Sequence, residues 1–175
     1  MVHRLQRMPG AGASKLLSRR KKGGMRFAIC REMTPREIEL VQSTWKSMLP
    51  VRDTFAELFY GKLFSVDPAL RRLFTGDMTE QGRNLAAMIS IAVRSLAQPE
   101  NVAVALHGLG RRHAAYGVRA RDYDTVSVAL LWTLSHALGE DFTDEAEAAW
   151  REAYGQLAEA MQRGAPNRSA RLAAE

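Results

Sequence analysis

Apolar residues recur at about every third or fourth position along most of the chain, which is the period of an α-helix. No segment shows the strict alternation of apolar and polar residues that is typical of a half-buried strand. The pattern begins clearly at Thr34, where Pro35 and Glu37 complete a capping box with proline at the first helical position. Pro50 ends this first predicted helix.

Further helical segments follow, separated by residues that break helices. The breaks include Asp67-Pro68, Thr75-Gly76-Asp77, Pro99 and Gly139. The predicted segments cover about residues 52–65, 68–74, 79–97, 99–117, 121–138 and the stretch that follows Thr143. We therefore expect an all-α protein of about seven helices around one core, with no repeat and no second domain.

Both ends of the chain differ in composition from its middle. Residues 1–32 hold nine Lys or Arg and one acid, Glu32, and they include Gly-rich stretches, so we expect a disordered basic extension. The folded domain is expected over 33–163, with a flexible tail over 164–175. The extension fits a basic arm that contacts lipid or nucleic acid, a solvated tail, or a start codon upstream of the one in use, since Met33 directly precedes the first helix.

The distribution of charge changes how the net charge of +6 is interpreted. Residues 33–175 hold 16 basic and 18 acidic residues, so the folded body lacks the positive surface that nucleic-acid binding requires. No apolar run approaches the ~18 residues of a membrane span. The single cysteine, Cys30, excludes a disulfide framework within the chain and suits a reducing, cytoplasmic location.

His113 is the first candidate for a functional residue. At helical spacing it shares a face with Leu106, Leu109 and Tyr116, so its imidazole lies on an apolar stripe. Burying an unpaired polar group costs ~1–3 kcal/mol, so this imidazole needs a partner. Taken alone, the residues leave two interpretations open: a core histidine with a hydrogen-bond partner, or a metal ligand.

Tyr60 and Gln81 are two further polar residues on apolar faces. Tyr60 shares a face with Leu63, and Gln81 precedes Leu85 by one helical turn. Each has an ordinary structural explanation, since a buried tyrosine finds a local partner and a glutamine near a helix start points to solvent. Together with His113, however, they place polar groups from three helices around one apolar cavity, which describes a ligand pocket.

Several segments, in this order and spacing, resemble the globin family over residues 34–163. They are Trp45, Asp67-Pro68, Leu73-Phe74, Leu109-Gly-Arg-Arg-His113 and Ala149-Trp150-Arg-Glu-Ala-Tyr154. The pattern is most similar to single-domain bacterial haemoglobins and to the globin part of flavohaemoproteins, with neuroglobin-like sequences next. This resemblance implies a globin fold with a haem pocket, haem b as cofactor, and His113 as the proximal ligand of the iron.

The resemblance also implies roles for other residues around the haem. Tyr60 and Gln81 correspond to the distal tyrosine and glutamine, and Leu85 to the aliphatic residue over the iron. Tyr123 corresponds to the tyrosine near the proximal ligand. The residues implied to pack the porphyrin are Phe74, Leu109, Val118 and Val126.

The chain departs from the family pattern at two places. Flavohaemoproteins carry a glutamate on the last helix that contacts the proximal histidine and tyrosine, and Ala165 stands at that position here. Glu159 could replace it only in a different helix register. Asn84 stands where a basic residue is often found, so Arg83 or Arg112 would have to contact a haem propionate.

The resemblance therefore predicts reversible binding of O₂, and of NO and CO, at a five-coordinate ferrous haem. Tyr60 and Gln81 are expected to make O₂ binding tight by donating hydrogen bonds. One alternative is a nitric-oxide dioxygenase that depends on a separate reductase, because no FAD or NAD(P)H domain is present in this sequence. A haem-based gas sensor is a further alternative, although no transmitter domain accompanies the pattern.

Overall fold

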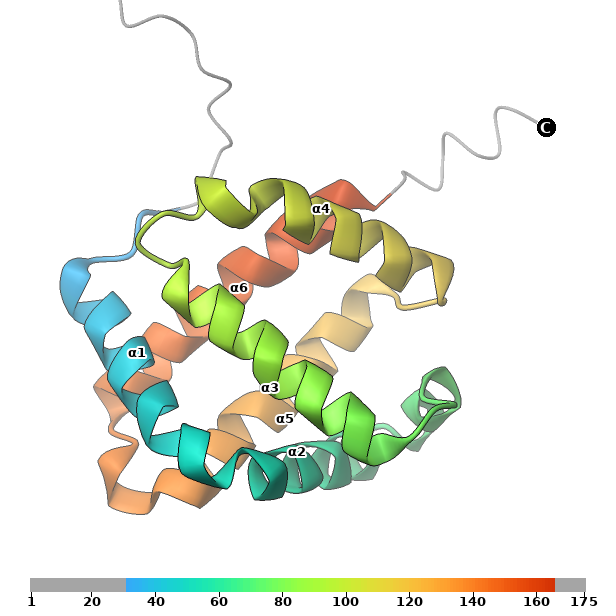
Figure 1. Ribbon diagram of the computed structural model, residues 1–175, viewed down its shortest axis with the longest axis horizontal. Coiled ribbons are helices and arrows are strands. Elements are labelled where there is room, and N and C mark those ends of the chain that lie inside the picture. Colours follow the sequence, from blue (N-terminus) through green and yellow to red (C-terminus); the bar gives the residue numbers. More distant parts are fainter. Residues whose placement is uncertain (1–30, 166–175) are drawn as a thin grey trace, which may run out of the picture.

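The structure is a computed structural model, and it describes residues 31–165. Within these residues the chain forms six α-helices joined by three short 3-10 helices and turns (Figure 1). The helices are α1 Pro35–Met48, α2 Arg52–Val66, α3 Met78–Arg94, α4 Glu100–Ala115, α5 Ala120–Leu138 and α6 Asp144–Gly164. With the 3-10 helix Pro68–Leu73, they match the predicted segments. Residues 1–30 of the extension expected over 1–32, and residues 166–175 of the tail expected over 164–175, lie outside the described residues, whereas Gly164 is the last residue of α6.

The helices α1, α3 and α6 begin at side chains that cap them. Thr34 accepts a hydrogen bond from the backbone N–H of Glu37 at 3.2 Å, and the Glu37 carboxylate accepts one from the backbone N–H of Thr34 at 2.7 Å. Asp77 caps α3, and Thr143 caps α6. These side chains satisfy backbone donors that the first turn of a helix leaves without partners.

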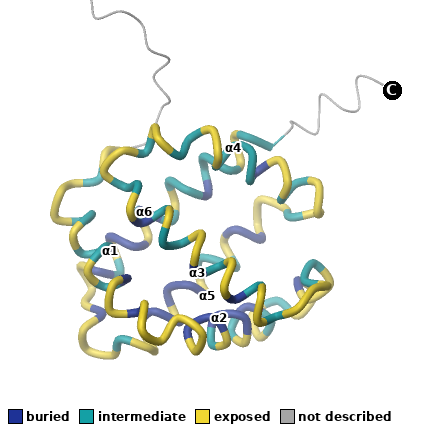
Figure 2. The backbone as a smooth tube through the Cα atoms, in the orientation of Figure 1, coloured by how far each residue is buried: buried dark blue, intermediate teal, exposed yellow. Residues whose placement is uncertain are grey.

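The core lies between α1, α2, α5 and α6, and it is built on aromatic residues. The Trp45 ring meets the rings of Phe55 and Trp150 edge-on, at centroid distances of 5.2 Å and 6.2 Å. The Trp45 indole N–H donates to Ser90, and that of Trp150 donates to Thr44. Both indoles therefore bury their apolar surface without leaving a polar group unpaired. Figure 2 shows buried stretches along α2, α5 and α6, whereas α4 is mostly intermediate or exposed.

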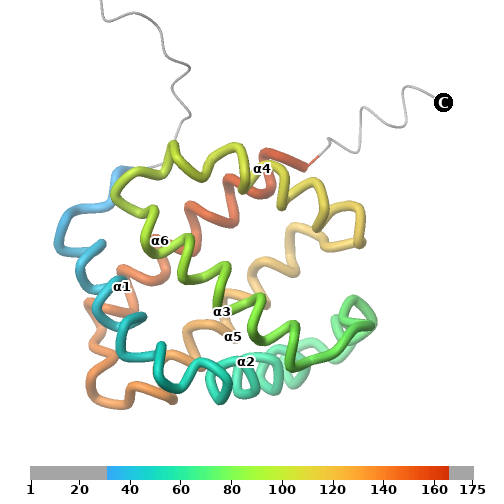
Figure 3. Tube along the Cα trace, viewed as in Figure 1, coloured from blue at the N-terminus to red at the C-terminus, as the bar shows by residue number. Residues whose placement is uncertain are grey.

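Helix α4 lies against α6 at very short range, although the whole of α5 lies between the two helices in the sequence (Figure 3). Gly110 makes this possible, because a Cβ added to it would lie 1.8 Å from the carbonyl oxygen of Met161. Gly164 plays the same role against the backbone of His107. Gly110 is also the one buried residue of α4. The helix that carries His113 is thus held by backbone-to-backbone packing.

The expectation that Tyr116 faces the interior together with His113 was wrong. The helix ends at Ala115, and Tyr116 is its C-cap with 71% of its surface exposed. Gly117 follows with φ of 90°, and its N–H donates to Ala114 while that of Val118 donates to the carbonyl of His113. This is a Schellman ending, which turns the chain out of the helix and brings Val118 back toward His113.

Candidate functional site

His113 lies in the last turn of α4 and is half-buried. Its Nδ1 is 2.9 Å from the carbonyl oxygen of Leu109, one turn earlier. Because a carbonyl only accepts, this contact requires the proton on Nδ1 and leaves the lone pair of Nε2 available. The same arrangement orients metal-binding histidines in general. Nδ1 of His113 thus has the hydrogen-bond partner that a core histidine needs, and Nε2 stays available to a metal.

Two tyrosines surround the proximal side. The Tyr123 ring, at the start of α5, lies 6.2 Å from the His113 ring with the two planes inclined by 27°. Tyr154 of α6 donates its hydroxyl hydrogen to the carbonyl of Tyr123 at 2.8 Å. Burial raises the pKa of both phenols above the usual value, so both hydroxyls stay protonated in ordinary buffers.

The carboxylates of this region have other partners. Ala165, the position that corresponds to the family's glutamate, is the C-cap of α6. Glu159 accepts a hydrogen bond from Arg163 at 2.8 Å. Asp122 is buried at the start of α5 and accepts from the backbone N–H of Arg119 at 2.8 Å. The structure therefore places a tyrosine, Tyr123, rather than one of these acids against the imidazole.

Tyr60 lies on α2 and is buried among aromatic rings. Its ring lies 5.3 Å from that of Phe74 and 5.9 Å from that of Phe64. Its hydroxyl donates to the backbone carbonyl of Gln81, at a long 3.4 Å. Burial raises the pKa of Tyr60 to about 12, so the phenol keeps its proton. The structure thus places the Tyr60 ring beside Phe74 and its hydroxyl at the backbone of Gln81, and the roles of these residues at a ligand stay a prediction.

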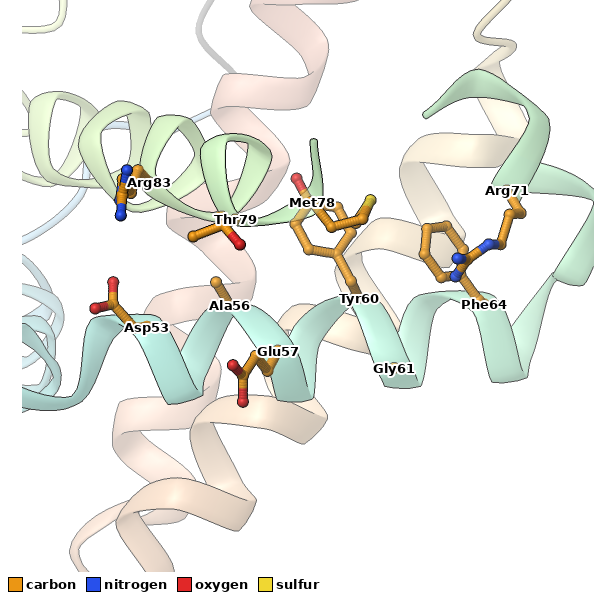
Figure 4. A pocket seen from close by; sticks show the side chains of 11 residues that line it. Asp53, Ala56, Glu57, Tyr60, Gly61, Phe64, Arg71, Met78, Thr79 and Arg83 are labelled. Atoms are coloured by element: carbon orange, nitrogen blue, oxygen red, sulfur yellow. The ribbon is translucent and has the colours of Figure 1, made fainter. Parts of the chain in front are cut away.

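A cavity of about 330 Å³ between α2 and α3 gives access to the Tyr60 ring. Figure 4 shows Tyr60 reaching from α2 toward Met78 at the start of α3, with Phe64 and Arg71 on one side of it. The Arg71 guanidinium lies 5.0 Å above the Phe64 ring, a cation–π contact. Of the three polar residues Tyr60, Gln81 and His113, only Tyr60 lines this cavity.

The remaining predicted residues are apolar side chains that the protein buries only in part. Leu85 follows Gln81 by one helical turn on α3 and is half-buried. The half-buried apolar residues expected to pack a porphyrin are Phe74, Leu85, Leu109, Val118 and Val126.

These features fit a haem group. One imidazole offers an available Nε2, and the half-buried apolar side chains named above are of the kind that pack a porphyrin face. The two arginines proposed for the propionates, Arg83 and Arg112, are both exposed. Arg83 lines the cavity between α2 and α3, whereas Arg112 adjoins His113 in sequence. Their contact with a propionate stays a prediction.

Comparison with known proteins agrees with this geometry. The family model described as Globin matches residues 57–161. The chain is 28% identical over 132 residues to the flavohemoprotein of Rhizobium meliloti (strain 1021) and 30% identical over 132 residues to those of Bordetella pertussis and Bordetella parapertussis. Each alignment covers 74% of this chain and 33% of the relative, so the chain spans about a third of their length.

Within residues 31–165, no helix combines the length and apolar character needed to cross a membrane. The helical architecture, the position of His113 at the end of α4 and a family model that covers more than half of the chain agree with one another. The chain therefore belongs to the globin family.

Proposed function

We propose that this chain is a haem-b globin that binds O₂ reversibly and also takes NO and CO. Membership of the globin family supports haem binding, and the names of the relatives, flavohemoproteins, agree with it. The observation that carries the proposal is the hydrogen bond from Nδ1 of His113 to Leu109, because it leaves Nε2 available to hold a metal. A cytoplasmic location is part of the same proposal.

The chain's own residues would hold the group from two sides. His113 would bind the iron through Nε2, and the half-buried Leu85, Val118 and Val126 would pack the porphyrin and exclude water. When bound, haem supplies a ferrous iron that takes one diatomic gas molecule at its open position. Leu109 keeps the imidazole at a fixed angle through its carbonyl.

On the distal side, Tyr60 is the hydrogen-bond donor. Its phenol keeps its proton because burial raises its pKa to about 12, and the long 3.4 Å bond to the Gln81 carbonyl is easily exchanged for a bond to a gas ligand. The Gln81 amide supplies a second donor. Since neither residue is a histidine, the ferrous iron is expected to be five-coordinate in the absence of a gas.

A second candidate function is the oxidation of NO to nitrate. The flavohemoprotein relatives and the protonated Tyr60 favour it. The reaction combines one NO and one O₂ with one electron to give nitrate, so each turnover requires an electron donor. We propose that a separate reductase delivers that electron.

The test of haem binding is a titration of the purified chain with haemin, followed by reduction. We expect one haem per chain and a five-coordinate ferrous spectrum. The variant His113→Ala should lose this spectrum and regain it with added imidazole. His136→Ala is the matched control, since His136 is exposed and stacks on Trp132 at 4.8 Å. A spectrum that His113→Ala leaves unchanged contradicts the proposal.

The two functions differ in their response to NO and to a reductase. Rapid mixing of the oxygenated holoprotein with NO, followed by nitrate analysis, measures a single turnover. Repeated turnover with a supplied flavin reductase and NADH supports the dioxygenase. Slow nitrate formation with and without the reductase supports reversible O₂ binding as the function.

A further inference from the structure

A second cavity, of about 190 Å³, lies between the end of α3, the first half of α4 and the last half of α6. Its walls are mostly apolar and come from all three helices, with Ala92 on α3, Leu106 on α4 and Leu157 on α6. The site described above does not use this cavity. An apolar hollow of this kind is favourable for an apolar side chain, because the burial of such a side chain removes it from water.

The N-terminal segment enters the described structure beside this cavity. The Gln156 side-chain amide donates to the backbone carbonyl of Arg31 at 2.7 Å, and Gln156 also lines the cavity. The Arg31 guanidinium pairs with Glu37 at 2.6 Å and lies 3.7 Å from Glu152, one turn before Gln156 on α6. These contacts fix the point from which residues 1–30 leave the described part of the chain.

The six residues before Arg31 have a composition that suits an apolar cavity. They are Met25-Arg-Phe-Ala-Ile-Cys30, in which large apolar residues occupy alternate positions. Phe27 lies four residues before Arg31, and four residues of extended chain reach at most ~14 Å. The cavity's lining on α6 from Gln156 to Arg163 spans only ~10 Å of helix.

Charge also favours this occupant. Residues 1–30 contain eight Lys or Arg and no Asp or Glu. Glu100 and Glu159 line the cavity, and Glu152 already pairs with Arg31 beside it. A basic segment is attracted to a site bordered by carboxylates, even where some of these carboxylates already have a partner.

We propose that residues 25–30 of this chain occupy the cavity between α3, α4 and α6, with the side chains of Phe27 and Ile29 inserted among its apolar walls. In this position the segment contacts both α4 and α6, whose backbones already meet at Gly110. This role is independent of haem, and it differs from those of a solvated tail and of an arm that contacts lipid or nucleic acid.

Hydrogen exchange of the full chain tests the proposal. In Phe27→Asp/Ile29→Asp, the amides of residues 96–107 and 153–163 should exchange at least about fivefold faster than in the wild type, because removing the occupant exposes the cavity. Leu16→Asp/Leu17→Asp is the matched control, since it makes the same change of charge and polarity elsewhere in the segment. Equal exchange in the two double variants overturns the proposal.

A second measurement follows the segment itself. Cys30 is the chain's one cysteine, so its rate of reaction with a thiol reagent reports on residue 30. Ala103→Trp fills the cavity and should raise this rate at least about fivefold. Val104→Trp is the control, because Val104 is 82% exposed and does not line the cavity.

An unchanged Cys30 rate in Ala103→Trp overturns the proposal. Exchange protection that rises with protein concentration and persists in Phe27→Asp/Ile29→Asp also overturns it, since a second copy of the chain would then be the occupant.

Discussion

Tyr60 shows how one side chain can belong to the core and to a binding site. Its ring packs among Phe64 and Phe74, which fixes its place on α2. Its hydroxyl meets only a backbone carbonyl, that of Gln81, at 3.4 Å. Such a long hydrogen bond satisfies a buried phenol in the absence of a ligand and costs little to exchange. A donor held in this way is available when a gas molecule arrives.

Removal of the distal donors should therefore accelerate the release of O₂. Each net hydrogen bond contributes ~0.5–1.5 kcal/mol, so Tyr60→Phe/Gln81→Leu should release O₂ about 10- to 100-fold faster than the wild type. Stopped-flow displacement of O₂ by CO measures this rate. Tyr116→Phe is the control, because Tyr116 is exposed on the outside of α4. A double variant that releases O₂ at the wild-type rate refutes the role given to these donors.

A residue of the site could be predicted only where the local sequence pattern singled it out. Tyr60, Gln81 and His113 stood out because each interrupts an apolar stripe at helical spacing. Tyr116 was misplaced because the stripe was extended one turn beyond the end of α4, where Gly117 turns the chain. The bond from Tyr60 to the Gln81 backbone depends on how α2 and α3 cross, and no local pattern reports that crossing.

At the scale of elements, α4 is the least enclosed helix and carries the proposed iron ligand. Its start and end followed from Pro99 and Gly117 in the sequence. Its close approach to α6 could not be predicted, because the sequence shows a glycine at position 110 but not which residue packs against it. The structure supplies the partner, the backbone of Met161, and so explains why no side chain fits there.

This packing predicts opposite effects for two glycines of α4. Gly110→Ala forces α4 away from α6, because its Cβ would overlap the Met161 carbonyl, and overpacking typically costs ~1–3 kcal/mol. Gly108→Ala meets only the end of the Arg111 side chain at 3.6 Å and should stabilise the helix by ~0.5–1 kcal/mol. Urea unfolding of both variants measures these changes. Equal stabilities would show that α4 does not depend on the contact with α6.

At the scale of the whole molecule, the core and the proximal helix are held in different ways. The helices α1, α2, α5 and α6 share an aromatic core tied by distant hydrogen bonds, such as the one from Trp150 to Thr44. Helix α4 contributes one buried residue, Gly110, and approaches α6 through its backbone. Regions with few buried contacts open first, so α4 is expected to exchange its amides before α5 does.

Two tyrosines, Tyr60 and Tyr154, make the stability of the whole molecule sensitive to alkaline pH. Burial raises the pKa of Tyr60 to about 12 and also raises that of Tyr154, whereas an unfolded tyrosine titrates near 10. A group whose pKa is higher in the folded state stabilises the fold below its unfolded pKa and loses this contribution as the pH rises through the folded value. The stability of the apoprotein should therefore fall from about pH 10 upward, by on the order of 1 kcal/mol per buried phenol near pH 11.5.

Urea unfolding of the apoprotein at a series of pH values from 8 to about 11.5 measures this loss. Tyr60→Phe removes one of the titrating groups, so its free energy of unfolding should decline less steeply than that of the wild type. Tyr116→Phe provides the comparison, since the Tyr116 ring is 71% exposed and its removal should leave the slope unchanged. Lysine deprotonation affects all three proteins alike, so the difference between the two variants isolates the buried phenol. Parallel declines in Tyr60→Phe and Tyr116→Phe would mean that Tyr60 titrates from a solvated position, and its place as a protonated donor in the distal group would then be lost as well.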